Sequence, residues 1–169
     1  MRLRAVAAGA ASLVAIAGLL VSVGWREGSS WTRNNPVDAA EVAPDGSATQ
    51  RGVTIRFDGL DQVDRLTGRF GDALVPPEGW TLWVAGLEVS GVTGTGFSVE
   101  AVVVASDGTR YTRSDRITFD HAPEEGWFAE FLIENGTWTD AFLLPEDVEP
   151  VRLELVPTDV ARNYWSFDV

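Results

Sequence analysis

A period of two in the alternation of apolar and polar residues runs through the chain after Gly52 and limits the folds open to it. In VTIRF, at 53–57, the valine, isoleucine and phenylalanine would point to one side of an extended strand and the polar residues to the other. VRLEL, at 151–155, repeats the pattern. Such strands bury one face, and no segment after Gly52 keeps a helical period over three turns. The pattern therefore predicts an all-β fold.

Turn signals divide the chain into short strands. Asp107-Gly108 follows FSVEAVVV, and Asn135-Gly136 lies between WFAEFLI and TWTDAFLL. Both dipeptides tolerate the positive φ angles of tight hairpin turns. We expect strands at 53–57, 81–90, 97–104, 109–113, 116–119, 127–133, 138–144, 151–156 and 163–168, with DQVDRL near 62–66 as a tenth strand or a loop edge.

The length of 53–169 suits an immunoglobulin-like antiparallel β-sandwich. FSVEAVVV is partly apolar on both faces, which indicates a central strand. Trp83, Trp127 or Trp165 could be the central tryptophan of the core, and the sequence does not rank them. The chain has no cysteine, so the core must hold the domain without disulfides. Lipid attachment at a cysteine, zinc–thiolate sites and thiol nucleophiles are excluded for the same reason.

An uncharged segment from Ala5 to Trp25 follows Arg2 and Arg4. A helix of about 20 residues crosses the hydrocarbon core of a bilayer, and the two arginines place its N-terminus in the cytoplasm. We expect residues 1–25 to form a transmembrane signal-anchor helix. The alternative is a cleaved signal peptide, for which Ser22-Val23-Gly24 offers small residues, but an Ala-x-Ala site in the usual place is missing. Both interpretations export the remainder of the chain.

Residues 26–52 have a different composition, rich in serine, asparagine, proline, glycine and aspartate. Such a segment buries too little apolar surface to offset its ordering entropy. We interpret it as a flexible linker between the membrane and an extracytoplasmic domain at 53–169.

The formal net charge of −12 argues against several partners. Without Arg2 and Arg4, 11 basic residues face 25 acidic ones, which leaves −14 on the chain after Trp25. A domain of this charge repels nucleic acid and anionic lipid headgroups. The acidic excess is typical of a soluble exported domain, and we expect no nucleic-acid partner.

Residues that carry out catalysis or bind metals do not form a recognisable motif. His121 is the sole histidine, beside Asp120, but no serine lies in a G-x-S-x-G turn. Asp58, Asp61 and Asp64 are three apart, unlike the D-x-D-x-D-G calcium loop. We therefore expect a non-enzymatic protein with no catalytic residues, no metal site and no cofactor.

The tryptophans give the stronger signal for binding. Trp80 and Trp83 are three apart, so on a strand they would point to opposite faces. Trp138 lies between two threonines, just after the Asn135-Gly136 turn. We take Trp80 and Trp138 as candidate partner-binding residues, since an exposed indole can anchor a protein or a glycan. Edge packing is the structural alternative for both.

The order of segments resembles a known family in outline. An apolar N-terminus, a low-complexity spacer and a small β domain with SDGTRYT and AFLLPEDVEPVRLELVP are similar to immunoglobulin-like extracytoplasmic domains of unknown function in Gram-positive lipoproteins and membrane proteins. The positions that carry the resemblance are Asp107, Gly108, Tyr111, Phe142, Leu144 and Pro145. Many relatives carry a lipidated cysteine that is absent here. The resemblance implies an accessory or binding role at the cell envelope and brings no catalytic residues.

These observations predict a single-pass membrane protein whose extracytoplasmic domain binds another protein of the envelope. The alternative is a module that binds cell-wall glycan through exposed tryptophans. A small hydrolase is the third possibility.

Overall fold

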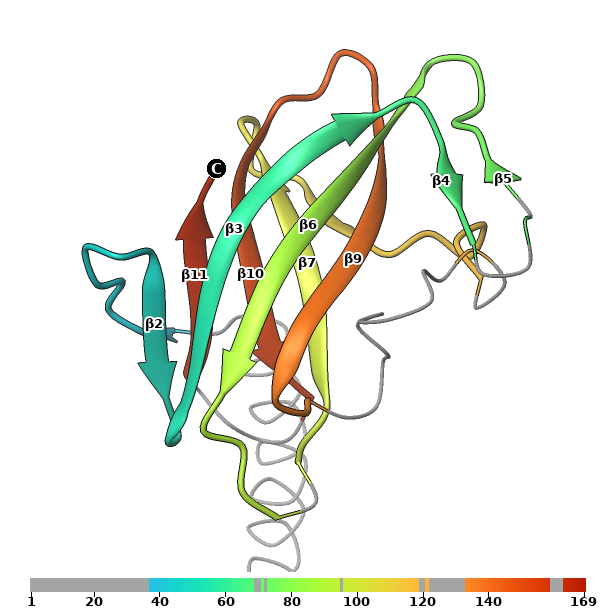
Figure 1. The fold of residues 1–169 in the computed structure, drawn as a ribbon. Coiled ribbons are helices and arrows are strands. Elements are labelled where there is room, and N and C mark those ends of the chain that lie inside the picture. The colour runs from blue at the N-terminus through green and yellow to red at the C-terminus, as the bar shows by residue number, and fades with distance from the viewer. Residues whose placement is uncertain are drawn as a thin grey trace, which may run out of the picture.

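The computed structural model describes residues 37–68, 71, 73–94, 96–118, 121, 133–158 and 163–169. Within this part, the chain is all-β, and two main sheets pack face to face (Figure 1). One sheet has the order β1 (Asp38–Ala39), β11 (Asn163–Asp168), β10 (Pro150–Pro157), β7 (Val99–Ala105) and β8 (Arg110–Thr112). The other has the order β2 (Ser47–Gln50), β3 (Val53–Val63), β6 (Trp80–Ser90) and β9 (Gly136–Pro145). Strands β4 (Leu66–Thr67) and β5 (Ala73–Leu74) pair antiparallel in a separate small sheet.

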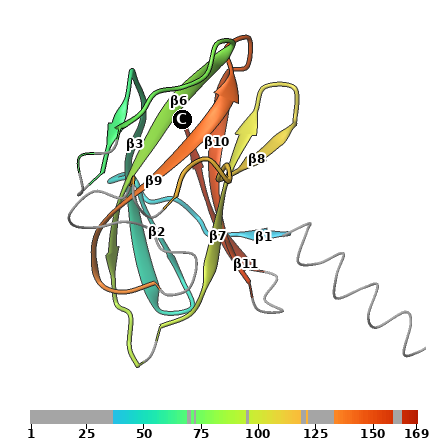
Figure 2. The same cartoon turned by 90° about the vertical axis from the view of Figure 1, so that its right-hand side faces the viewer.

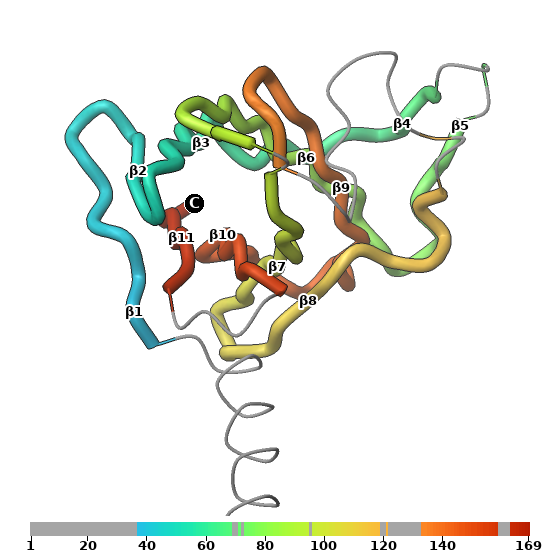
Figure 3. Tube along the Cα trace, turned by 90° about the horizontal axis from the view of Figure 1, so that it is seen from below, coloured from blue at the N-terminus to red at the C-terminus, as the bar shows by residue number. Residues whose placement is uncertain are grey.

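The main core lies between these two sheets, which are seen along their strands in Figure 3. Trp165 of β11 is the largest fully buried side chain among the described residues. Its ring stacks on Phe97 with 5.9 Å between the centroids. Trp165 is therefore the central core tryptophan, whereas Trp83 packs at the margin and is partly buried. Trp127 lies outside the described residues.

Several predicted strands and one predicted turn are confirmed. Strands β3, β6, β7, β8, β9, β10 and β11 all overlap the predicted ranges. FSVEAVVV supplies β7, which is central between β10 and β8 and buries Val102 and Val104 on its second face. At the β7–β8 turn, Gly108 has a φ of 85° and donates its N–H to the carbonyl of Ala105 at 2.9 Å.

The sandwich begins before residue 53, so the linker predicted at 26–52 is too long on its C-terminal side. Strand β2 pairs with β3, and β1 pairs in parallel with β11. The sequence SATQ of β2 is polar apart from Ala48, which is buried. A four-residue edge strand with one apolar contact has too little alternation to be recognised from sequence.

The strand predicted at 116–119 is wrong over its described residues. Ile117 instead lies in a turn, where its N–H donates to the carbonyl of Ser114 at 2.9 Å. Ile117 is buried against Leu82, Ala141 and Leu143 on the outer face of the four-stranded sheet. Its apolar side chain therefore contributes to a second hydrophobic cluster. Most of the strand predicted at 127–133 lies outside the described residues, and Ile133 itself is not in a strand.

The predicted alternation fails at Val151 because of a β-bulge. The register between β10 and β7 shifts between Pro150 and Arg152. Val151 is consequently 39% exposed, while Leu153 and Leu155 are fully buried. A bulge adds a residue to one strand and re-aims the side chains around it.

Asn135-Gly136 does not form the tight hairpin turn that we predicted. Gly136 is already part of β9 and pairs with Val89. The Asn135 side chain accepts from the N–H of Val92 at 2.9 Å and donates to its carbonyl at 3.1 Å. Asn135 thus ties the start of β9 to the β6–β7 loop.

The predicted anchor helix at 1–25 lies outside the described residues. No helix in the described part of the chain is long and apolar enough to cross a membrane.

Neighbouring positions on β10 provide a test of the core. We expect Leu153→Ala to lower the free energy of unfolding by about 2–5 kcal/mol, since it leaves a cavity between the sheets. Val151→Ala should change it by less than about 0.5 kcal/mol, since Val151 is partly in solvent. Urea denaturation followed by tryptophan fluorescence measures both. Equal losses would contradict the bulged register.

Candidate partner-binding site around Trp80

Trp80 is the first residue of β6, and its side chain is 41% exposed. The backbone N–H of Trp80 donates to the carbonyl of Pro77 at 3.0 Å, and the β6–β9 pairing places Trp80 opposite Pro145. The N–H of Glu146 closes the same end by donating to the carbonyl of Gly79 at 3.0 Å. These bonds fix the backbone from which the indole projects. Trp83 packs on the main core, so the prediction that Trp80 and Trp83 point to opposite faces is confirmed.

A cavity of about 120 Å³ lies beside the indole. Trp80 and Pro77 contribute from the start of β6, Leu143 from β9, and Ser114 and Arg116 from the chain that follows β8. Pockets for small molecules usually measure about 300–1,000 Å³. The Trp80 cavity therefore has room for one side chain of a larger partner.

Arg116 gives this cavity its charge. Its guanidinium makes no ion pair within the described part of the chain, although its backbone N–H donates to the Ser114 hydroxyl at 3.3 Å. The side chain is exposed. Sequence analysis missed Arg116 because the turn that places it beside Trp80 was predicted to be a strand.

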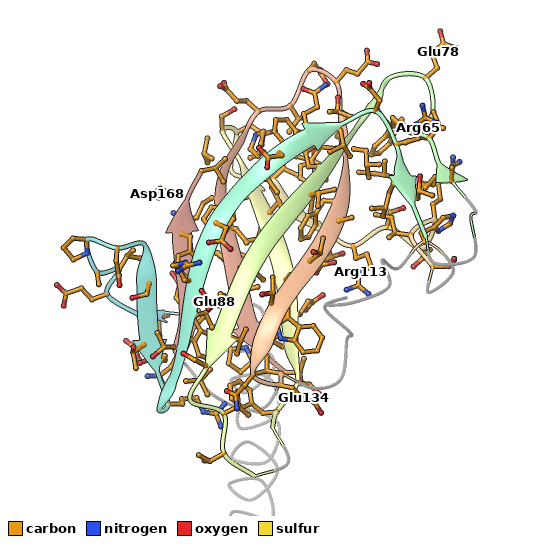
Figure 4. The ribbon with its side chains drawn as sticks, viewed as in Figure 1. Arg65, Glu78, Glu88, Arg113, Glu134 and Asp168 are labelled. Carbon is orange, nitrogen blue, oxygen red and sulfur yellow. The ribbon has the colours of Figure 1, made fainter. Side chains whose placement is uncertain are left out.

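Trp138, the second candidate, lies elsewhere. It is partly buried against the main core, and its Nε1–H donates to the carbonyl of Glu134 at 2.8 Å. Trp138 faces Leu87, seven residues along the β6–β9 ladder from Trp80, a separation of about 23 Å. Figure 4 shows Glu78 and Glu134, which neighbour the two tryptophans in sequence, at opposite ends of the molecule. The two indoles therefore do not form one binding surface.

A larger cavity, of about 330 Å³, lies beside an ion pair. It is lined by Val99, Glu100, Ala101, Thr112, Arg113, Asp115, Asp140 and Thr158. Asp140 is only 2% exposed, and its Oδ1 accepts from Arg113 Nε at 3.0 Å, from Arg113 Nη2 at 2.9 Å and from the N–H of Ala141 at 2.9 Å. Figure 4 shows Arg113 beside β9, and Figure 2 views the side of the sandwich where β8 and β9 lie. The buried carboxylate is thus compensated within the chain, as buried charges must be.

His121 makes a local hydrogen bond within its own loop. Its Nδ1 accepts from the backbone N–H of Thr118 at 3.1 Å. Asp58 pairs instead with Arg56 at 3.0 Å on the surface of β3. Within the described residues, no group of three or more histidine and acidic side chains is placed to hold a metal ion.

Perturbed carboxyl groups occur in two tight turns of the scaffold. The backbone N–H and hydroxyl of Thr109 hold the pKa of Asp107 below its ordinary value. The hydroxyl and N–H of Ser47 lower the pKa of Asp45 in the same way. Because the unfolded chain binds these protons more readily, the stability from both turns is present above about pH 4 and is lost as the pH falls further.

Comparisons with known proteins leave the chain without a family. No protein family model matches it, and no curated protein does. A crystal structure of a conserved hypothetical protein from Bacillus anthracis is similar, with a TM-score of 0.48 and 9% sequence identity over 79% of this chain and 98% of that chain.

The contrast between two ion pairs tests the role assigned to Asp140. We expect Asp140→Ala to lower the free energy of unfolding by about 3 kcal/mol, since it leaves the Arg113 charge without its buried partner. The control, Asp58→Ala, removes a carboxylate from an exposed pair and should cost less than about 1 kcal/mol. Thermal and urea unfolding measure both variants. A stability unchanged by Asp140→Ala would rule out a structural role and return the larger cavity to consideration as a ligand site.

Proposed function

We propose that this chain is a membrane-anchored extracytoplasmic protein that docks another protein of the cell envelope through Trp80. The observation that carries the proposal is an exposed tryptophan on a fixed strand end, beside a cavity the size of one side chain. Tryptophan and arginine are enriched among the residues that dominate binding energy at protein interfaces. Trp80 and Arg116 supply both at one place.

The finer features of the fold belong to the same proposal. We assign the domain to the immunoglobulin-like sandwiches on the strength of its two facing, mainly antiparallel sheets. The uncharged run from Ala5 to Trp25 supports a signal-anchor helix at 1–25, with the sandwich outside the cell. Cleavage of this run would release the same domain as a secreted protein.

The size of the site favours a protein partner over a small-molecule substrate. A substrate is usually surrounded by its enzyme, whereas the Trp80 cavity offers about 120 Å³. An interface needs only a few anchor positions around which neighbouring contacts exclude water. The hydrolase is the least supported of the three possibilities, since His121 bonds its own loop.

Cell-wall glycan is the alternative ligand. The exposed face of Trp80 could stack on a sugar ring, and Ser114 and Arg116 could bond its hydroxyls. Retention of the purified full-length chain on cell-wall material, with loss of retention in Trp80→Ala, would favour this alternative.

Site-specific crosslinking in native membranes tests the proposal. A photoreactive amino acid replaces Val75, which precedes Trp80 and is 63% exposed, and in a second protein replaces the exposed Val42 between β1 and β2. We expect a discrete protein adduct from position 75 and none from position 42. Because the indole anchors the partner, Trp80→Ala should reduce the adduct at least tenfold. Mass spectrometry then identifies the partner.

An adduct that forms equally from both positions, or that persists in Trp80→Ala, would contradict docking through this site. The intact mass of the purified chain, taken from the membrane and from the medium, tests the anchor: a released chain shorter by the N-terminal segment would identify that segment as a cleaved signal peptide.

A further inference from the structure

We infer that the partner residue entering the Trp80 cavity is an aspartate or glutamate within an otherwise apolar segment. This inference rests on the proposed docking function and adds the chemistry of the partner. Its basis is an arginine that has no ion-pair partner among the described residues and that lines the cavity where a partner would dock.

The distribution of ion pairs separates Arg116 from most of the described arginines. Most described arginines already meet acidic side chains: Arg56 with Asp58 and Glu88, Arg110 and Arg152 with Glu154, and Arg113 with Asp140. The chain has 25 acidic residues against 13 basic ones, so carboxylates are abundant. Within the part of the chain that the structure describes, Arg116 nevertheless has no ion-pair partner, which leaves its guanidinium available to an incoming anion.

The cavity supplies a second hydrogen-bond donor for such an anion. The Ser114 oxygen accepts the backbone N–H of Arg116 at 3.3 Å, and its own hydroxyl hydrogen remains free to rotate toward a ligand. A carboxylate can accept from this hydroxyl and from the guanidinium at once. Hydrogen bonds between charged groups are roughly twice as strong as neutral ones.

The apolar walls determine what surrounds the carboxylate. Pro77, Trp80 and Leu143 line the cavity, and Val75, two residues before Pro77 in the sequence, is 63% exposed. These groups suit the methylene carbons of an acidic side chain and apolar residues on either side of it. An acidic residue with apolar residues on both sides of it must lie inside a partner segment. The expected ligand is therefore an internal acidic side chain and not the carboxylate of a free C-terminus.

The test is a peptide array probed with the full-length chain in detergent. Each seven-residue peptide carries a central aspartate or glutamate among apolar residues, and its matched peptide carries asparagine or glutamine. A third set places the carboxylate at a free C-terminus. We expect the wild-type chain to retain internal-acid peptides at least tenfold more strongly than their amide counterparts and the C-terminal set.

Arg116→Gln should abolish that preference, and Arg116→Lys should keep part of it, because the charge remains while the planar fork is lost. The control is Arg65→Gln, which removes another exposed arginine that has no ion pair among the described residues and does not line the cavity. It should bind as wild type does. Both arginines are exposed, so we expect all three variants to fold, and thermal unfolding checks this.

The inference is overturned if amide peptides bind as well as acidic ones, if Arg116→Gln keeps the preference, if C-terminal carboxylates bind best, or if no acidic peptide is retained. The crosslinking experiment separates this failure from that of the proposed function. An adduct that depends on Trp80 while the array shows no acid preference leaves the docking site standing and removes the carboxylate. An adduct that is indifferent to Trp80 removes both.

Discussion

The rest of the structure depends on the burial of apolar side chains between two sheets that no disulfide connects. Ala101, Leu155 and Trp165 face one another across β7, β10 and β11 and form one row of that core. Each large side chain that is fully buried contributes about 1.5–3 kcal/mol relative to exposure. Within the described residues the buried Nε1–H of Trp165 has no hydrogen-bond acceptor. The contribution of Trp165 to stability therefore comes from the apolar area that its large ring buries. The lost hydrogen bond is offset by the area that the ring buries and by its stacking on Phe97.

The candidate site depends on the outer face of the four-stranded sheet, which carries a second hydrophobic cluster. Strand β6 faces the main core with Leu87 and the outer cluster with Leu82. Ile117 packs on that outer cluster, which fixes the turn containing Arg116 against the sheet. Arg116 lines the Trp80 cavity because its neighbour in sequence is an apolar anchor. If this outer face were polar, Ile117 would have no apolar residues to pack against, and the turn would not be fixed to the sheet.

Sequence alone predicts what is local and misses what depends on distant contacts. The alternation in VTIRF and the Asp107-Gly108 turn are encoded within a few residues, and both appear in the structure. The hairpin expected at Asn135-Gly136 fails because the Asn135 side chain bonds Val92, 43 residues away. Arg113 pairs with Asp140 across 27 residues, although an acidic residue next to the apolar run AFLL was a detectable signal. The Trp80 site combines both cases: its indole was identified from the sequence, but its arginine was not.

The two principal residues of the site differ in how much order binding would impose on them. Trp80 projects from a strand whose backbone is already hydrogen-bonded, and an indole has few rotamers, so immobilising it costs little entropy. Arg116 is long and exposed, and fixing such a side chain costs about 0.5–1.5 kcal/mol. The charge-assisted bonds that it forms must exceed this cost, and bidentate geometry to a carboxylate favours them. The indole is therefore suited to supply affinity for many apolar surfaces, while the arginine is suited to select among them.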